Sequence, residues 1–167
     1  MRSRAALPTN PATDPATTLP DPSVPDDGLR LDQQLCFALY SASLAMTKVY
    51  RPLLDALGLT YPQYLVMLVL WERGTVSVGE LGERLNLDSG TLTPLLKRLE
   101  TQGRLVRSRG VDDERRVDIR LTDEGRALRE QARTIPPRIL AGAGCTLDEL
   151  GTLTRRLQAL RQTLQER

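Results

Sequence analysis

The feature that most constrains the fold is a change of hydrophobic period in the middle of the chain. Two short helices are predicted first, because Ser77 and Asp88 are helix-capping side chains that leucines follow at helical spacing. Gly103 ends the second helix. Beyond it, Leu105–Arg109 and Val117–Leu121 have the strand patterns of a hairpin. Two helices joined by a tight turn and followed by a β-hairpin make a winged helix-turn-helix pattern, which is typical of DNA-binding units.

The segments on both sides of this unit are predicted to be helices that need a second subunit. The helix expected within 29–58 is too apolar to lie half-exposed on a surface. The last helix places leucines from Leu147 to Leu164 at steps of 3, 3, 4, 3 and 4, which suits a helical dimer interface. We therefore expect a mainly α chain, with dimerisation helices in 29–58 and 123–167 and a winged helix-turn-helix in 60–122.

Residues 1–28 are predicted to lie outside the folded domain, which we expect to span 29–167. They hold six of the eleven prolines of the chain and show no apolar periodicity. Four aspartates accompany only two arginines there, so the segment is not a basic arm that binds DNA. We interpret it as a disordered proline-rich tail.

The amino-acid composition excludes several kinds of site. The chain has no histidine, which rules out Ser-His-Asp catalysis and histidine metal ligands. Its two cysteines cannot by themselves form a structural zinc site or an iron–sulfur cage, so we expect neither a metal nor a cofactor. There is no apolar run of about 18 residues and no signal-peptide pattern. We expect a cytoplasmic protein without a membrane segment, in which an unpaired thiol stays reduced.

A local basic surface is expected on the second helix of the helix-turn-helix and on the hairpin. The net charge of the whole chain is only +2, but residues 84–120 hold nine basic against six acidic side chains. Small polar residues at the start of that helix allow close approach to phosphates and base edges. The candidate DNA-contacting residues are Ser89, Thr91, Thr93, Lys97, Arg98, Arg115 and Arg116. Helix-turn-helix patterns also occur in modules that bind only protein, which is the alternative.

All six aromatic residues fall between positions 37 and 71, next to Cys36. They are either the large core residues, our interpretation of Phe37 and Trp71, or the walls of a pocket around the thiol. Tyr40 shares a helix face with Cys36. Tyr50 is fourteen residues further on, or ~21 Å along a straight helix, so only a partner subunit or a sharp bend could bring it to the thiol. If Asp32 capped this helix, Cys36 would lie in the first turn, where the helix dipole favours a thiolate.

Residues 113–125, with the sequence DERRVDIRLTDEG, resemble the D-x-R-x-x-x-(I/L)-x-L-T-x-x-G wing signature of the MarR family. Four other segments look like the organic hydroperoxide resistance regulators within that family. They are residues 35–40, 50–54, 59–72 and 87–98. The resemblance covers roughly residues 30–165 and leaves out the proline-rich segment.

The resemblance implies an intertwined homodimeric repressor that senses organic hydroperoxides through one N-terminal cysteine. Cys36 matches the sensing position, and Tyr50 and Tyr61 match tyrosines that hydrogen-bond the thiolate across the dimer, with Tyr40 a further candidate. By the same resemblance, Asp113 braces Arg115, which enters the minor groove.

Some members of this family carry a second cysteine near the C-terminus, which forms an intersubunit disulfide with the oxidised sensor. Cys145, between two glycines in a predicted loop, matches that position less specifically, and the alternative is a bystander thiol.

The function predicted from the sequence is that of a DNA-binding repressor, not an enzyme. The reduced homodimer holds a pseudo-palindromic double-stranded operator. An organic hydroperoxide oxidises Cys36, which forms a disulfide with Cys145 of the other subunit, and the DNA is released. Two alternatives are a MarR-type repressor induced by a small phenolic ligand and a thiol peroxidase using the same cysteines.

Overall fold

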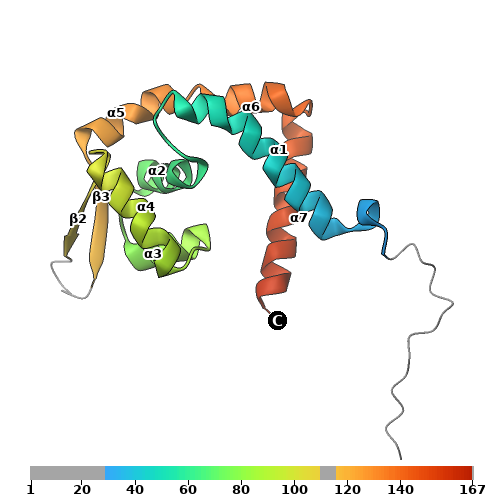
Figure 1. The fold of residues 1–167 in the computed structure, drawn as a ribbon, viewed down its shortest axis with the longest axis horizontal. Helices are drawn as coiled ribbons and strands as arrows, with labels where there is room; N and C mark the ends of the chain where they lie inside the picture. The colour runs from blue at the N-terminus through green and yellow to red at the C-terminus, as the bar shows by residue number, and fades with distance from the viewer. Residues whose placement is uncertain (1–28, 110–115, 167) are drawn as a thin grey trace, which may run out of the picture. The chain divides into compact units, whose positions relative to one another are not determined.

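The computed structural model of the chain describes residues 29–109 and 116–166, and the chain divides into two units after Tyr40. A short 3-10 helix at Leu31–Gln33 precedes the main elements. These elements, labelled in Figure 1, are α1 (Leu35–Asp55), α2 (Tyr61–Arg73), β1 (Thr75–Ser77), α3 (Val78–Leu85), α4 (Ser89–Thr101), β2 (Leu105–Arg109), β3 (Val117–Leu121), α5 (Asp123–Ala132), α6 (Ile135–Ala143) and α7 (Leu147–Gln165).

α2, α3, α4, α5 and α7 begin at the capping residues that the sequence predicts. In each case a side-chain oxygen accepts a hydrogen bond from the backbone N–H three residues further on, which satisfies a donor that the helix leaves without a partner. The capping residues are Thr60, Ser77, Asp88, Thr122 and Thr146. Asn86 ends α3 in the left-handed region at φ 54°, which makes the tight turn between α3 and α4.

The predicted hairpin is confirmed, but it belongs to a sheet of three strands. β3 pairs antiparallel with β2 on one side and with β1 on the other, so that Ile119 lies between Arg107 and Val76. No sequence pattern indicates β1. Its three residues are too few to show an alternating pattern, and pairing with β3, some 40 residues away, is what makes this segment a strand.

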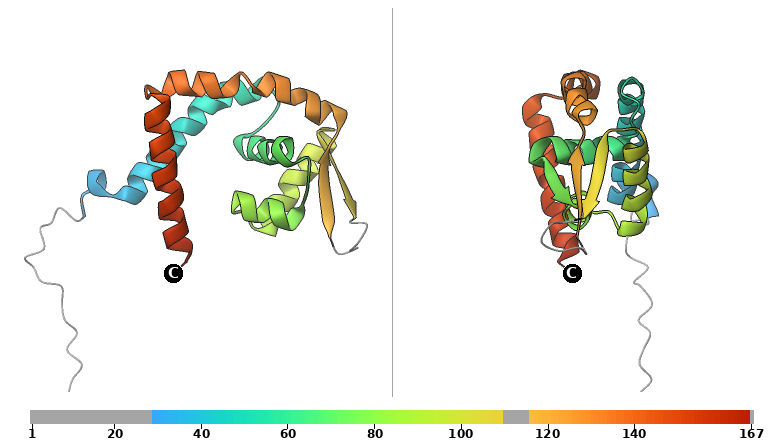
Figure 2. Two further views of the ribbon diagram at one scale, coloured as in Figure 1. Left: turned by 180° about the vertical axis from the view of Figure 1, so that it is seen from behind. Right: turned by 90° about the vertical axis from the view of Figure 1, so that its left-hand side faces the viewer.

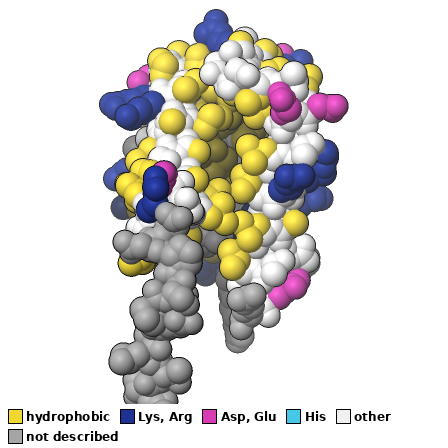
Figure 3. Space-filling view, turned by 90° about the vertical axis from the view of Figure 1, so that its right-hand side faces the viewer, with side chains coloured by type: hydrophobic (Ala, Val, Ile, Leu, Met, Phe, Trp, Pro, Cys, Tyr) yellow, Lys and Arg dark blue, Asp and Glu magenta, His cyan; other side chains and the backbone are white. Residues whose placement is uncertain are grey.

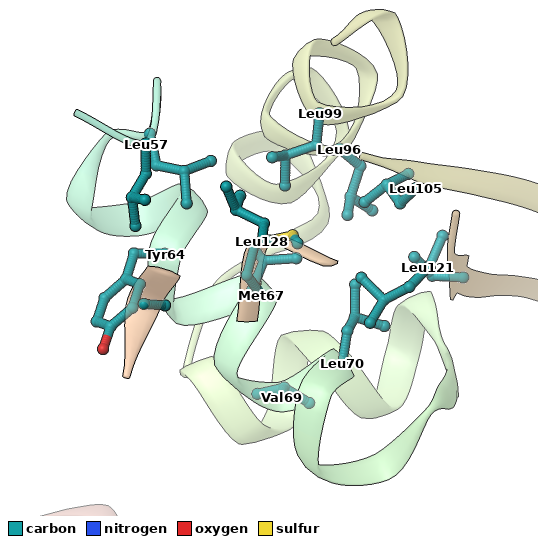
Figure 4. Close-up of a cluster of buried hydrophobic side chains, with 14 of the residues drawn as sticks. Leu57, Tyr64, Met67, Val69, Leu70, Leu96, Leu99, Leu105, Leu121 and Leu128 are labelled. Atoms are coloured by element: carbon teal, nitrogen blue, oxygen red, sulfur yellow. The ribbon is translucent and has the colours of Figure 1, made fainter. Parts of the chain in front are cut away.

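The core of the winged helix-turn-helix is formed by leucines that the helical periodicity predicts. Figure 4 shows Met67 and Leu70 of α2 close to Leu96 and Leu99 of α4, with Leu105 of the sheet beside them. All of these side chains are at most 1% exposed. The inner face of α4 is therefore fixed against α2 and the sheet, and its outer face is available for other contacts.

The root of the wing is held by Gly125 in the first turn of α5. A Cβ atom added there would lie 1.9 Å from the backbone oxygen of Arg104, so this close approach requires glycine. The Trp71 indole N–H donates to the Gly125 oxygen at 2.9 Å, and the Thr122 N–H donates to the Arg104 oxygen at 3.2 Å. These contacts give the threonine and the glycine of the wing signature a structural role.

The predicted interruption near Pro136 and Pro137 is found, slightly upstream of both. α5 ends at Ala132, and α6 begins at Ile135 with the prolines in its first turn, where their missing N–H groups are not needed. Gly144, at φ 65°, then ends α6, and α7 leaves in a new direction (Figure 2).

The two long helices are poorly covered in the single chain. Leu54 is the only buried residue of α1, and none of the described residues of α7 is buried. Hydrophobic side chains cover much of the face drawn in Figure 3. Phe37 is 39% exposed, so its interpretation as a core residue is wrong for the single chain, whereas Trp71 is half-buried against the core. Among the described residues, no helix is both long and apolar enough to cross a bilayer.

A candidate DNA-reading head and two thiols

The outer face of α4 carries the predicted DNA-contacting residues of the helix-turn-helix. Leu92, Leu96 and Leu99 are at most 1% exposed on the inner face. The residues left exposed include Ser89, Thr91, Thr93, Lys97 and Arg98. The sequence prediction and the observed exposure therefore agree on which face of α4 a ligand can reach.

The start of α4 is fixed by hydrogen bonds between Asp88 and Thr91. The Asp88 carboxylate accepts from the Thr91 N–H at 2.9 Å and from the Thr91 hydroxyl at 2.8 Å. Both donations favour the ionised form and lower the pKa of Asp88 below its usual value. The Thr93 hydroxyl donates to the Ser89 oxygen at 2.7 Å. The hydroxyl protons of both threonines are therefore already used in hydrogen bonds at the start of α4.

The wing contributes Arg116 at the start of β3. Its Nε donates to the Asp118 carboxylate at 2.7 Å. A hollow of about 470 Å³ lies between the start of α3, α4 and the sheet, and Ser77, Thr93, Arg107 and Arg116 are among its lining residues. The predicted pair Asp113 and Arg115 lies outside the described residues.

Three tyrosines and a tryptophan form a cluster on α1 and α2. The ring centroids of Tyr50 and Tyr61 are 4.9 Å apart, those of Tyr50 and Tyr64 are 6.0 Å apart, and those of Tyr64 and Trp71 are 6.2 Å apart. Burial and the neighbouring phenols raise the pKa of Tyr50 and of Tyr64. These two phenols therefore keep their protons and remain hydrogen-bond donors well into the alkaline range.

Tyr64 is the cluster member that the sequence analysis did not select. It is only 4% exposed and touches both Tyr50 and Trp71. Its position three residues after Tyr61 places the two side chains on one face of α2, a spacing from which the cluster could have been predicted.

Cys36 is an exposed, free thiol and the second residue of α1. Asp32 does not cap this helix, contrary to the sequence expectation. It lies in the preceding 3-10 helix, where its carboxylate accepts hydrogen bonds from Arg30 at 3.1 and 3.3 Å. Tyr40, one helical turn after Cys36, is 62% exposed. The first turn of α1 thus presents its thiol without an acidic side chain in the cap position.

Cys145 is also exposed and free, in the loop between α6 and α7. It follows Gly144, and its thiol donates to the Ala143 oxygen at 3.4 Å. Within the described residues, no group of three or more His, Cys, Asp or Glu side chains is arranged to hold a metal ion.

A family model matches half of this chain, and a known regulator matches most of it. A family model described as transcriptional regulator SarA/Rot matches residues 48–131. The organic hydroperoxide resistance transcriptional regulator of Bacillus subtilis is 50% identical over 141 residues, which are 84% of this chain and 96% of that relative.

Solved structures of AbfR, a protein of Staphylococcus epidermidis, have the same fold. The crystal structure of AbfR superposes with a TM-score of 0.71 at 36% identity, over 84% of this chain and 97% of that one. Reduced AbfR bound to DNA superposes with a TM-score of 0.68 at 36% identity, over 84% of this chain and 96% of AbfR. Disulfide-formed AbfR superposes with a TM-score of 0.56 at 37% identity, over 80% of this chain and 94% of AbfR. The described part of this chain shares with these structures a winged helix, the unit that α3, α4 and the sheet form.

Proposed function

Because this chain belongs to the MarR and SarA family of transcriptional regulators, we propose that it is a homodimeric repressor that releases DNA when an organic hydroperoxide oxidises Cys36. One observation carries the proposal. The thiol of Cys36 is free and exposed in the first turn of α1, in a chain that is 50% identical over 141 residues to an organic hydroperoxide resistance regulator.

The DNA-binding part of the proposal uses the outer face of α4 and the wing. In a dimer, the two α4 helices enter successive major grooves of a pseudo-palindromic operator. Lys97 and Arg98 neutralise phosphates, while Ser89, Thr91 and Thr93 approach base edges. Arg116 and, beyond the described residues, Arg115 with Asp113 serve the neighbouring minor groove. The AbfR structure on DNA supports this assignment by its similarity in fold.

The exposed apolar side chains of α1 and α7 support the homodimer. Leu35 is 58% exposed and Leu44 is 48% exposed on α1, and Leu153 is 53% exposed on α7. Large apolar side chains exposed in this way mark protein–protein interfaces. Pairing of residues 29–58 and 123–167 with their copies would bury it and leave the segment 60–122 of each subunit to bind DNA.

The sensing part of the proposal pairs Cys36 of one subunit with tyrosines of the other. α1 is helical without interruption between Cys36 and Tyr50, and fourteen residues of α-helix span ~21 Å. The proposed donors to the thiolate are Tyr50 and Tyr61 of the partner subunit, which match the tyrosines of the family, and Tyr40 lies on the same helix face as the thiol. Hydrogen bonds donated by phenols favour the thiolate, which is the nucleophilic form of the sulfur.

The chemistry proceeds in two balanced steps. The Cys36 thiolate attacks the terminal oxygen of the hydroperoxide, so the O–O bond breaks, the sulfur becomes a sulfenic acid, and the alcohol leaves after taking a proton. The thiol of Cys145 in the other subunit then attacks the sulfenic sulfur, which forms the disulfide and releases water. A disulfide requires the two Cα atoms to lie within about 7 Å, so any larger starting separation must close, and the spacing of the two α4 helices changes with it.

The experiment compares DNA release by wild type, Cys36→Ser and Cys145→Ser at one fixed salt concentration, because phosphate contacts make the affinity salt-dependent. The probe is a duplex that the reduced wild type selects from a randomised pool. We expect cumene hydroperoxide to release it from wild type and not from Cys36→Ser, with cumyl alcohol as the inactive control. Non-reducing gels should show a covalent dimer that Cys145→Ser abolishes. Full release from Cys36→Ser would refute the sensor, and a covalent dimer of Cys145→Ser would refute the pairing.

A pocket of about 470 Å³ between α2 and α5 favours a second candidate function, induction by a small phenolic acid. Tyr64 and Trp71 supply aromatic surface there, Arg129 and Arg133 supply positive charge, and Glu72 supplies one negative charge. Pockets of this size and composition bind small aromatic ligands. Under this candidate, a phenolic acid releases DNA equally from wild type and from Cys36→Ser, whereas the peroxide has no effect.

A further inference from the structure

An ion pair between α4 and the wing joins the two surfaces that are proposed to contact DNA. Arg107 lies in β2 and Glu100 in the last turn of α4. The Arg107 Nε donates to Glu100 Oε2 at 2.8 Å, its Nη2 lies 2.6 Å from the same oxygen, and its backbone N–H donates to Glu100 Oε1 at 3.3 Å. Glu100 therefore bonds both the side chain and the backbone of one wing residue.

The ion pair between Glu100 and Arg107 is less exposed to solvent than an ordinary surface ion pair, so its two charges attract each other more strongly. The two side chains are 33% and 34% exposed, whereas those of the pair Arg133 and Glu130, within α5 and its C-terminal cap, are 66% and 69% exposed. Less solvent between the charges means less screening. The hydrogen bonds from Arg107 also lower the pKa of Glu100 below its usual value, so the carboxylate stays ionised at neutral pH.

The position of the pair matters because a winged helix must place two elements in different grooves at once. Thr93 and Lys97 are exposed on α4, and Arg107 of β2 pairs in register with Ile119 of β3, the strand that Arg116 precedes. Arg107 lines the same hollow as Thr93 and Arg116, and Glu100 bonds it from the α4 side. A change in the angle between β2 and α4 would therefore move the wing arginines relative to the recognition helix.

We propose that Glu100 and Arg107 are positioning residues, which hold the wing at the angle to α4 that DNA binding requires and do not themselves contact DNA. The inference rests on the proposed DNA binding and concerns a different step. Two nitrogens of the guanidinium are already bonded to Glu100, and an acidic side chain is unfavourable against a phosphate. Without the pair, the wing samples other angles relative to α4. The apparent affinity for DNA then falls in proportion to the fraction of molecules in which the wing has the angle that binding requires.

The test measures binding of Glu100→Ala, Arg107→Ala and the double variant to a duplex that the wild type selects from a randomised pool. We expect each single variant to bind about fivefold more weakly, and the double variant no more weakly than the singles, since both remove the same interaction. Glu130→Ala is the matched control, because it removes a carboxylate and an ion pair away from the wing. It should bind like wild type.

The direction in which Glu100→Ala changes the affinity for DNA distinguishes a positioning role from a simple effect of charge. Removing a negative charge near DNA strengthens binding if charge alone matters, whereas loss of positioning weakens it. Tighter or unchanged binding by Glu100→Ala would overturn the proposal. The salt dependence gives a second criterion. A phosphate contact by Arg107 would reduce the slope of log K against log salt by about 1 in Arg107→Ala, and we expect an unchanged slope.

A measurement without DNA keeps this inference separate from the proposed function. In Glu100→Ala the Arg107 amide loses its acceptor, so its hydrogen exchange should become several-fold faster than in wild type and in Glu130→Ala. If the wild type selects no duplex, the proposed DNA binding fails. The amide exchange alone then decides whether the pair holds the wing. Unchanged exchange at Arg107 would then refute the pair as a device that holds the wing.

Discussion

Gly125 is the position at which one added methyl group should destabilise the protein most clearly. In Gly125→Ala the new Cβ would lie 1.9 Å from the backbone oxygen of Arg104 and 3.2 Å from a methyl carbon of Leu121. Ordinary contacts between carbon and oxygen are about 3.3 Å or longer. The first turn of α5 and the backbone at Arg104 must therefore separate by more than an ångström, and neither is the flexible end of a side chain.

The expected magnitude follows from the contacts that this separation stretches. The hydrogen bonds from Trp71 to Gly125 and from Thr122 to Arg104 contribute about 1 kcal/mol each to the free energy of unfolding. Overpacking adds about 1–3 kcal/mol. Alanine returns about 1 kcal/mol by its better helix propensity. The net loss is about 2–4 kcal/mol, a large part of the 5–15 kcal/mol that is typical of whole domains.

The assay is equilibrium unfolding in urea at one protein concentration, because the stability of a dimer depends on concentration. Gly151→Ala in α7 is the control. Its Cβ would meet only the end of the Arg155 side chain, at 3.6 Å, so it should be neutral or stabilising by up to about 1 kcal/mol. A Gly125→Ala protein as stable as the Gly151→Ala protein would refute the close approach that we describe.

Three further predictions follow from the described contacts. The pKa values of Tyr50 and Tyr64 are raised, so the stability that their protonated forms contribute is complete below about pH 10 and is lost as the pH rises above it. Tyrosinate absorbance against pH should show the raised pKa values, and the free energy of unfolding against pH should show the loss of stability. Gln63 is 4% exposed and accepts from the Thr60 N–H at 2.8 Å, so Gln63→Leu should lower the free energy of unfolding by about 1–3 kcal/mol; an unchanged melting temperature would contradict this. Arg98→Ala should weaken binding to all DNA sequences alike and reduce the salt slope by about 1, and a loss confined to one base position would instead indicate base recognition.

The elements that the sequence predicted correctly are those set by neighbouring residues. Thr60, Ser77, Asp88, Thr122 and Thr146 cap their helices as expected, because a cap joins residues only three positions apart. Leu92, Leu96 and Leu99 of α4 are buried as predicted and Leu95 is partly buried, because helical periodicity decides which face is apolar. Asp32 is the exception. A charged neighbour at Arg30 and a 3-10 turn, neither visible in the helical pattern, remove it from the cap position.

The candidate site was predicted less completely. Cys36, Cys145, Tyr50 and Tyr61 were selected by the pattern of residues and by family resemblance, and their sensing roles stay predictions. Tyr64 was not selected, because its contact with Tyr50 arises only when α1 and α2 pack together, although its contact with Trp71 lies within α2. The hydrogen bonds of the α4 threonine hydroxyls could not be predicted either, since a hydroxyl that can donate has several possible acceptors until the chain is folded.

By itself, the sequence determined the order and type of most elements and the positions of both thiols, because periodicity and caps act over a few residues. The tertiary structure alone decided the contacts between distant segments. It added β1 to the sheet by pairing with β3, placed Gly125 against Arg104, and bonded Trp71 to Gly125 across 54 positions. It also joined Glu100 to Arg107 between α4 and β2. Such contacts depend on how elements pack, and no local pattern encodes the angle at which a strand meets a helix.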